Sequence, residues 1–209
     1  MNIPKKIVVI GGSSAFGKND IEAGGFAGRL RRWHEEIDAH NWLYNMGIPG
    51  DGVDSVAARV DSEVAVRKPD LIILQLGPND AKREGTAEND PLNPLDEFHT
   101  KLAALLHSLK DLAPTLVVSA YPINEELTTP VSWRDVYFFA EDVAHYAKGT
   151  KDETLRAGLD YIDVYSDWEA MGDDRQKFMS DDGLHANSEG HEYIFEKVRD
   201  AILAQYGDN

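Results

Sequence analysis

Four consecutive β-branched residues near the N-terminus constrain the fold of this chain more than any other feature. Residues 7–10, Ile-Val-Val-Ile, are typical of a short strand buried on both faces, and Gly11 and Gly12 let the backbone turn sharply where it ends. Strands of this kind occur almost only in parallel sheets that helices cover on both sides. The stretch therefore predicts an α/β fold.

The same pattern continues through the rest of the chain. Apolar runs predict four further strands, and stretches with apolar residues three or four positions apart predict five helices. The strands are expected at 41–45, 70–76, 115–121 and 159–164, and the helices at 26–39, 53–67, 95–112, 133–155 and 188–206. This order predicts a single domain over residues 1–209, built on a five-stranded, doubly wound parallel sheet with helices on both faces.

Three polar segments are expected to form long connections, at 81–94, 122–132 and 165–180. Each follows a predicted strand and so begins at the carboxyl edge of the sheet. Ligands of open α/β sheets bind at that edge. We therefore expect these loops to set the shape of any pocket.

Composition excludes several classes of function. The chain has no cysteine, which excludes disulfides, thiolate metal sites and a cysteine nucleophile. Its formal net charge of −16, from 37 acidic and 21 basic residues, would be repelled by nucleic-acid phosphates and by anionic lipid. The apolar run near the N-terminus is too short for a signal peptide or a membrane span. We expect a cytoplasmic protein that binds no nucleic acid and does not insert into membranes; the sequence specifies no oligomeric state.

Ser13 lies directly after the first predicted strand. A hydroxyl at the carboxyl edge of a parallel sheet is a candidate nucleophile. The alternative is structural, because a Gly-Gly-Ser-Ser sequence after a strand is often only a turn that caps a helix.

A second candidate group stands near the C-terminus. Asp182 precedes His185 by three residues, and Gly183 between them permits a tight turn. Such a turn can bring the carboxylate against one imidazole nitrogen and leave the other free, as the base of a serine hydrolase requires. The alternative is a surface turn with an incidental hydrogen bond.

Four short motifs occur in a characteristic order. They are Gly-x-Ser13 after the first strand, Asn45-x-Gly47-x-x-Gly50 after the second, Gly77-x-Asn79-Asp80 after the third, and Asp182-x-x-His185 before the last helix. Together they resemble the four sequence blocks of the SGNH, or GDSL-type, hydrolases, over nearly the whole chain. The resemblance implies a flavodoxin-like three-layer sandwich and an acyl hydrolase or esterase.

The resemblance also implies roles for individual residues. Ser13 would be the nucleophile, His185 the general base and then acid, and Asp182 the carboxylate that orients the histidine. The main-chain N–H groups of Ser13 and Gly50 and the side-chain amide of Asn79 would form the oxyanion hole. This mechanism requires no cofactor, and the expected partner is a small-molecule acyl ester.

At one position the sequence departs from the family pattern. Gly12 stands where the family usually has an aspartate immediately before the serine. Asp51 and Asp20 are the residues that we consider as substitutes for that carboxylate. Two neighbours are also alternatives to the assigned residues, Ser14 to Ser13 and Asp181 to Asp182, and in both cases spacing favours the assigned residue.

The other histidines are expected to have structural or surface positions: His34, His40, His99, His107, His145 and His191. A metal site built from Asp80, Asp182 and His185 lacks the histidine-rich spacing of zinc sites, so no metal is expected.

The sequence thus favours hydrolysis of a carboxylic ester through an acyl-enzyme on Ser13. The polar, acidic loops favour a small or polar ester, such as an acetylated sugar, over long-chain lipid. The alternatives are a catalytically silent member of the family that binds a ligand and a nucleotide-binding Rossmann-like domain. The glycines at 11, 12 and 17 do not fit the dinucleotide-binding spacing.

Overall fold

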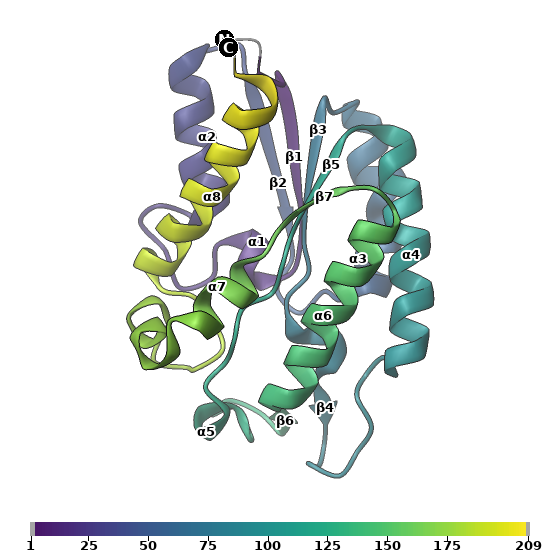
Figure 1. Ribbon diagram of the computed structural model, residues 1–209, viewed down its shortest axis with the longest axis vertical. Helices are drawn as coiled ribbons and strands as arrows, with labels where there is room; N and C mark the ends of the chain where they lie inside the picture. Colours follow the sequence, from purple (N-terminus) through teal and green to yellow (C-terminus); the bar gives the residue numbers. More distant parts are fainter. Residues whose placement is uncertain (1–2, 208–209) are drawn as a thin grey trace.

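The computed structural model describes residues 3–207 and contains the predicted five-stranded parallel sheet (Figure 1). The strands are β1 (Lys6–Gly11), β2 (Trp42–Gly47), β3 (Leu71–Gln75), β5 (Thr115–Val118) and β7 (Asp160–Ile162). They lie in the order β2-β1-β3-β5-β7, and every neighbouring pair is parallel. This is the doubly wound order of flavodoxin-like proteins.

Helices cover both faces of the sheet and give the three layers visible in Figure 1. On one face lie α2 (Gly25–Ile37) and α8 (Ser188–Tyr206), which pack against each other. On the other lie α3 (Val53–Arg59), α4 (Leu95–Leu112) and α6 (Ala140–Arg156). The predicted fold class is confirmed.

The strand β1 shows why the sheet needs both layers. Ile7 and Val9 belong to the core under α2 and α8, whereas Val8 and Ile10 belong to the core under α3 and α4. All four side chains are fully buried. Successive side chains of a strand point to opposite faces, so a run without polar residues needs a helix layer on each side.

The largest correction concerns the predicted helix at 133–155, because α6 begins only at Ala140. The residues before it form β6 (Val136–Tyr137), which pairs antiparallel with β4 (Arg83–Glu84). Val136 and Phe138 are buried in a small cluster at this end of the molecule. Val136 and Phe138 are two residues apart, so both can point to the same side only if the segment is extended. Their burial therefore favours an extended conformation over the predicted helix.

Smaller corrections affect the loops and one helix. The predicted helix at 53–67 is α-helical only as far as Arg59, and π and 3₁₀ turns complete it. The segment 122–132 contains α5 (Glu125–Thr128), and the segment 165–180 contains α7 (Val164–Ala170) and a 3₁₀ helix. Trp168 of α7 is fully buried, which explains why this segment is ordered as a helix.

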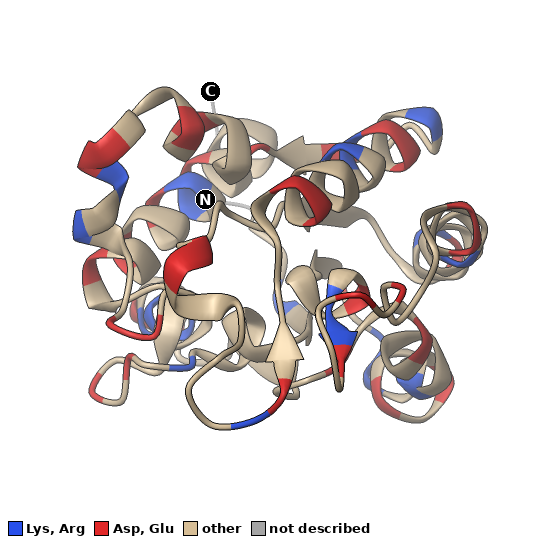
Figure 2. Cartoon of the chain, turned by 90° about the horizontal axis from the view of Figure 1, so that it is seen from below, with Lys and Arg blue, Asp and Glu red and all other residues tan. Residues whose placement is uncertain are grey.

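The carboxyl ends of the strands point downward in Figure 1, and Figure 2 looks at the molecule from that side. The turns after β1, β2 and β3 meet there, as do β4, β6 and the loop that precedes α8. Among the described helices, none is long and apolar enough to cross a membrane.

The packing predicts where substitutions destabilise the fold. Ile73 lies in the central strand β3 with no exposed surface, so Ile73→Ala should lower the free energy of unfolding by about 2–5 kcal/mol. Val66 is 65% exposed, and Val66→Ala should change the free energy of unfolding by less than about 0.5 kcal/mol. Urea unfolding of the two variants measures this difference, and equal losses would contradict the core assignment.

Candidate active site

Ser13 occupies the first position of a one-turn helix, α1 (Ser13–Phe16), directly after β1. The chain turns tightly here because Gly11 packs against the neighbouring strand. A Cβ at Gly11 would lie 1.9 Å from the main-chain oxygen of Gln75. The side chain of Ser13 lines a cavity at the carboxyl edge of the sheet.

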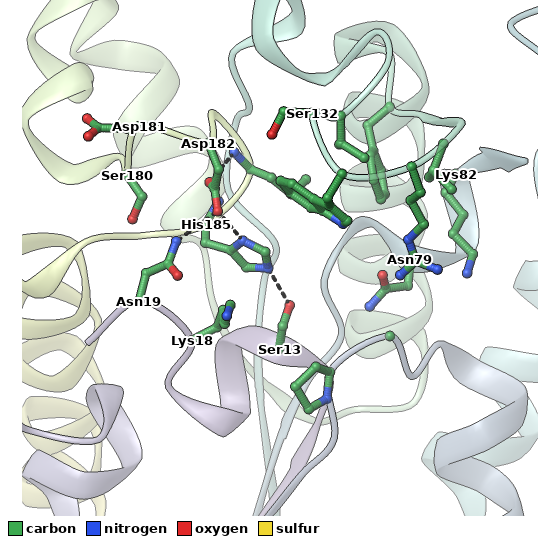
Figure 3. A pocket seen from close by; sticks show the side chains of 18 of the residues that line it. Ser13, Lys18, Asn19, Asn79, Lys82, Ser132, Ser180, Asp181, Asp182 and His185 are labelled. Atoms are coloured by element: carbon green, nitrogen blue, oxygen red, sulfur yellow. Dashed lines mark hydrogen bonds and ion pairs between the residues drawn. The ribbon is translucent and has the colours of Figure 1, made fainter. Parts of the chain in front are cut away.

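A chain of two hydrogen bonds joins Ser13 to His185 and Asp182 (Figure 3). Ser13 Oγ lies 3.0 Å from Nε2 of His185, and Nδ1 of the same ring lies 2.8 Å from Oδ2 of Asp182. Because a carboxylate only accepts, the Nδ1–H donates to Asp182, and Nε2 is left to accept from the serine hydroxyl. The three residues predicted to act together are in contact.

The turn between Asp182 and His185 is held by the aspartate itself. Oδ1 of Asp182 accepts hydrogen bonds from the main-chain N–H groups of Leu184 and His185, both at 2.9 Å. Gly183 adopts φ +70°, a left-handed conformation that glycine reaches easily, and this agrees with the tight turn that the sequence predicted here. Burial alone would raise the pKa of Asp182, but the hydrogen bonds from His185 and Leu184 outweigh it and hold this pKa well below its usual range.

Asn19 is a member of this network that sequence reasoning missed. Its side-chain amide donates to Oδ2 of Asp182 at 2.8 Å, beside the bond from His185 (Figure 3). Asn19 has φ +67°, a conformation in which asparagine is several-fold enriched. The only signal in the sequence was an asparagine in a loop close to the serine, which is too common to single out.

Gly50 and Asn79 line the same cavity as Ser13. Gly50 follows β2 with φ +95°, and no heavy atom lies within 4 Å of the position of its missing Cβ. Asn79 lies in a 3₁₀ turn after β3, and its amide donates one hydrogen bond to the main-chain oxygen of Asp51 at 3.0 Å. An asparagine amide has two N–H groups, so a second donor remains.

Asp80 joins these two loops. Its carboxylate accepts from the main-chain N–H of Val53 at 3.0 and 3.1 Å and from the Asn93 amide at 2.7 Å. Burial is the main cause that raises the pKa of Asp80, and these hydrogen bonds oppose it. The carboxylate thus ties the start of α3 to the turn that carries Asn79. As for metal sites, the described residues contain no group of three His, Cys, Asp or Glu side chains that could hold a metal ion.

Tyr121 links the turn that carries Ser13 to the loop that carries His185. Its hydroxyl accepts from the main-chain N–H of Ala186 at 3.0 Å and lies 2.7 Å from Ser14 Oγ. Burial raises the pKa of Tyr121 to about 12, so the hydroxyl keeps its proton and can donate it to Ser14. One buried side chain therefore contacts the residue after Ser13 and the residue after His185.

Ser14 and Asp181, the alternatives to Ser13 and Asp182, do not take part in the hydrogen-bonded chain. Ser14 is buried and faces Tyr121 rather than the cavity, so its hydroxyl is not available to a ligand. Asp181 lines the cavity, but its carboxylate makes no hydrogen bond to His185 in the described part of the chain. The geometry favours Ser13 and Asp182, as spacing did.

Neither proposed substitute for the family aspartate holds the serine turn with its carboxylate. The Asp20 carboxylate pairs with Arg29, and the Asp51 carboxylate pairs with Arg59 at 2.6 Å. Asp51 approaches Gly12 only through its main chain, since a Cβ at Gly12 would lie 3.0 Å from both the Asp51 oxygen and the Asn79 amide nitrogen. The Asp20 carboxylate also accepts from the main-chain N–H of Gly25 at 3.1 Å, so in the described part of the chain neither carboxylate bonds the serine turn directly.

His191 has the structural role that the sequence predicted. It is fully buried, its Nδ1 accepts from the Phe26 main-chain N–H at 3.3 Å, and its Nε2 donates to the Lys18 carbonyl at 3.0 Å. His191 thereby anchors the loop that carries Asn19. His34 is likewise buried and bonded to a main-chain carbonyl, that of Pro4.

The cavity above Ser13 has a volume of about 780 Å³. The loops predicted to shape it contribute only Lys82, Val131, Ser132, Met179 and Ser180. Four further lining residues come from the segment mistaken for a helix: Trp133, Arg134, Val136 and Phe138. Sequence reasoning missed these residues because it assigned the segment to a helix.

Comparison with known proteins identifies the family. The profile of the GDSL-like Lipase/Acylhydrolase family matches residues 9–193, and the chain belongs to this family. It is an ester-hydrolysing enzyme. A comparison with curated protein sequences finds no significant match.

Solved structures share the fold at low sequence identity. A lipase/acylhydrolase from Enterococcus faecalis has a TM-score of 0.77 and 21% identity, with 97% of each chain covered. The acetylxylan esterase Axe2 from Geobacillus stearothermophilus has a TM-score of 0.73 and 18% identity, with 97% of this chain and 96% of that chain covered. An α/β hydrolase, LAE5, from the metagenome of Lake Arreo has a TM-score of 0.71 and 19% identity, over 95% and 94%.

The position of Tyr121 predicts an effect on activity. Tyr121→Phe leaves the Ala186 N–H and Ser14 Oγ without their buried partner, so we expect a loss of about 1–3 kcal/mol in stability and roughly tenfold in kcat/KM for ester hydrolysis. Tyr161→Phe is the control, because that hydroxyl contacts the Ala147 carbonyl and lies outside the cavity. Full activity in Tyr121→Phe would contradict the positioning role.

Gly12 predicts a second effect. A side chain at this position would press against the Asn79 amide and the Asp51 carbonyl, so Gly12→Asp should lower kcat/KM by about tenfold or more rather than improve the enzyme. Gly77→Ala is the matched control, since no heavy atom lies within 4 Å of its missing Cβ. Steady-state hydrolysis of a short ester measures both, and a more active Gly12→Asp enzyme would refute this steric argument.

Proposed function

We propose that this enzyme hydrolyses carboxylic esters through an acyl-enzyme intermediate on Ser13. The observation that carries the proposal is the hydrogen-bonded chain from Ser13 through His185 to Asp182, with Ser13 at the floor of a cavity. A serine hydroxyl becomes an effective nucleophile when a histidine can take its proton and a carboxylate stabilises the resulting imidazolium.

The first half of the reaction forms the acyl-enzyme. Ser13 Oγ attacks the ester carbonyl carbon while its proton passes to Nε2 of His185, and the carbonyl π electrons move onto oxygen. When the tetrahedral intermediate collapses, the bond to the alcohol oxygen breaks, and His185 returns the proton to that oxygen. The alcohol leaves, and the acyl group remains on Ser13.

The second half repeats these steps with water. His185 takes a proton from water as the water oxygen attacks the acyl carbon. Collapse of the second intermediate breaks the bond to Ser13 Oγ and returns the proton to it, which releases the carboxylic acid. Asp182 keeps its negative charge throughout, as its lowered pKa favours.

The negative oxygen of both intermediates needs donors. The groups proposed for this role are the main-chain N–H groups of Ser13 and Gly50 and the free N–H of the Asn79 amide. The hydrogen bond from Asn79 to Asp51 and the contacts of Asp80 hold the amide before substrate arrives, so little reorganisation is needed.

The alternatives from the sequence have less support. Four positions that a silent ligand-binding member could have lost are retained: Ser13, Asn79, Asp182 and His185. In the structural neighbour Axe2, a serine-to-alanine and a histidine-to-alanine variant are described as catalytic mutants. Membership of the acylhydrolase family leaves no support for a nucleotide-binding Rossmann-like domain.

We propose a small or polar acyl ester, such as an acetylated sugar, as the substrate. Polar and charged side chains make up much of the cavity lining, among them Lys18, Asn19, Lys82 and Asp181. A site for a long acyl chain would need a more extended apolar lining. The neighbour Axe2 is an acetylxylan esterase, which agrees with this class of substrate.

The mechanism is tested by hydrolysis of a short-chain p-nitrophenyl ester. We expect Ser13→Ala and His185→Ala each to lower kcat by several powers of ten, to a similar residual level, because the members act as a unit. Ser132→Ala is the control, since this hydroxyl lines the same cavity without contacting His185. Activity that survives in Ser13→Ala would refute the assigned nucleophile.

The substrate class is tested with a series of acyl chain lengths. Two-carbon acyl esters should have a higher kcat/KM than twelve-carbon esters of the same alcohol, since a cavity of about 780 Å³ that polar and apolar side chains line together offers no continuous apolar surface to a long chain. Faster hydrolysis of the twelve-carbon esters would contradict this part of the proposal.

A further inference from the structure

The charge of the cavity is opposite to that of the whole chain. Acidic residues outnumber basic ones by 37 to 21 over the sequence, and red segments predominate on the helices in Figure 2. The lining of the cavity instead contains three basic residues, Lys18, Lys82 and Arg134, and two acidic ones, Asp181 and Asp182. Asp182 is already bound by Asn19 and His185, so its charge faces hydrogen-bond donors rather than a ligand.

Two of the cations belong to one wall. Lys82 directly precedes β4, Arg134 precedes the partner strand β6 by two residues, and both line the cavity. Because the antiparallel register pairs Arg83 with Tyr137, Lys82 and Arg134 lie at opposite ends of this strand pair. We call this the β4–β6 wall. Lys82 lies on the Asn79 side of Ser13, whereas Asp181 lies on the side of Asp182 (Figure 3).

One of these cations, Lys82, has a carboxylate partner, Glu84. The Lys82 ammonium bonds Glu84 at 2.8 Å, and its side chain is only 12% exposed. The hydrogen bond from Lys82, and to a lesser degree the charge of Arg134, lower the pKa of Glu84. Lys82 and Arg134 line the cavity whereas Glu84 does not, so the β4–β6 wall presents positive charge to a ligand in the cavity.

We propose that the β4–β6 wall binds a carboxylate on the substrate, so that the enzyme acts on acyl esters of acidic sugars in preference to neutral ones. This inference rests on the proposed esterase function and narrows its substrate class. Trp133, half exposed between Ser132 and Arg134, offers an apolar ring face at the same wall. A sugar ring carrying both an acyl ester and a carboxylate fits a site with a nucleophile, an aromatic face and adjacent cations.

The cations of the β4–β6 wall are expected to affect the choice between acidic and neutral substrates more than the overall affinity for substrate. A carboxylate bound at the β4–β6 wall gains a charge-assisted hydrogen bond from Lys82 or Arg134, while the acidic remainder of the surface repels anions that bind elsewhere. Because Arg134 is exposed, part of this attraction is screened by salt. A preference of about fivefold to tenfold in kcat/KM at low ionic strength is the expected size.

The test compares two esters that differ in one group, O-acetylated glucuronate and O-acetylated glucose, with acetate release measured at low salt. The wild type should prefer the glucuronate ester by about fivefold to tenfold, and high salt should reduce this ratio. The double variant Lys82→Met, Arg134→Gln should bring the ratio to about one, and Lys82→Arg should retain it. Arg134→Gln alone should lower the ratio and, being exposed, leaves the fold intact.

Lys148→Met is the matched control. Lys148 pairs with Asp152 on α6 and does not line the cavity, so the preference should be unchanged. Equal or faster hydrolysis of the glucose ester by the wild type, or a ratio that the double variant retains, would overturn the carboxylate site and leave the esterase proposal intact. If the wild type hydrolyses neither ester nor any p-nitrophenyl ester, the proposed function fails, and this inference fails with it.

Discussion

The hydrogen bond between Ser13 Oγ and His185 Nε2 is the interaction on which the rest of the site depends. It joins residues 172 positions apart in the sequence, so only the folded sheet can make it. On one side, the tight turn at Gly11 presents the serine at the carboxyl edge of the sheet. On the other, Asp182 and Tyr121 fix the histidine loop, and a misplacement of about 1 Å at such a contact is enough to lose most of the activity.

Much of the fold and of the catalytic group could be predicted from the sequence because each depends on a local pattern. The apolar run of β1 specifies a strand covered on both faces, and the sequence Asp182-Gly183-Leu184-His185 specifies a turn whose donors and acceptors lie within four residues. Contacts between distant segments could not be predicted from local patterns; the pairing of Ser13 with His185 was expected only from the resemblance of four motifs to a known family. Asn19 and Tyr121 are an ordinary loop residue and an ordinary buried aromatic until the fold brings them to Asp182 and Ala186.

The segment that carries Trp133 and Arg134 is a second case in which the sequence alone predicted the wrong local structure. The aromatic residues at 137–139 suggest a helix when only spacing is considered, yet this segment is extended because Val136 and Phe138 bury their side chains against Ile123 and Leu184. The residues that face a ligand therefore come from the part of the chain whose conformation depends most on tertiary contacts. In the proposed mechanism the chemistry rests on the turns at the strand ends, and in the proposed carboxylate site selectivity rests on the β4–β6 wall beside them.

The central claim, that Ser13 is the nucleophile activated by His185, is tested most directly by covalent labelling. An alkyl fluorophosphonate reacts with an activated serine hydroxyl, and mass spectrometry of the digested protein identifies the modified residue. If His185 activates Ser13, we expect one label on Ser13, none on the buried Ser14, and almost none in the His185→Ala variant. A label on another serine, or undiminished labelling of Ser13 without His185, would contradict it.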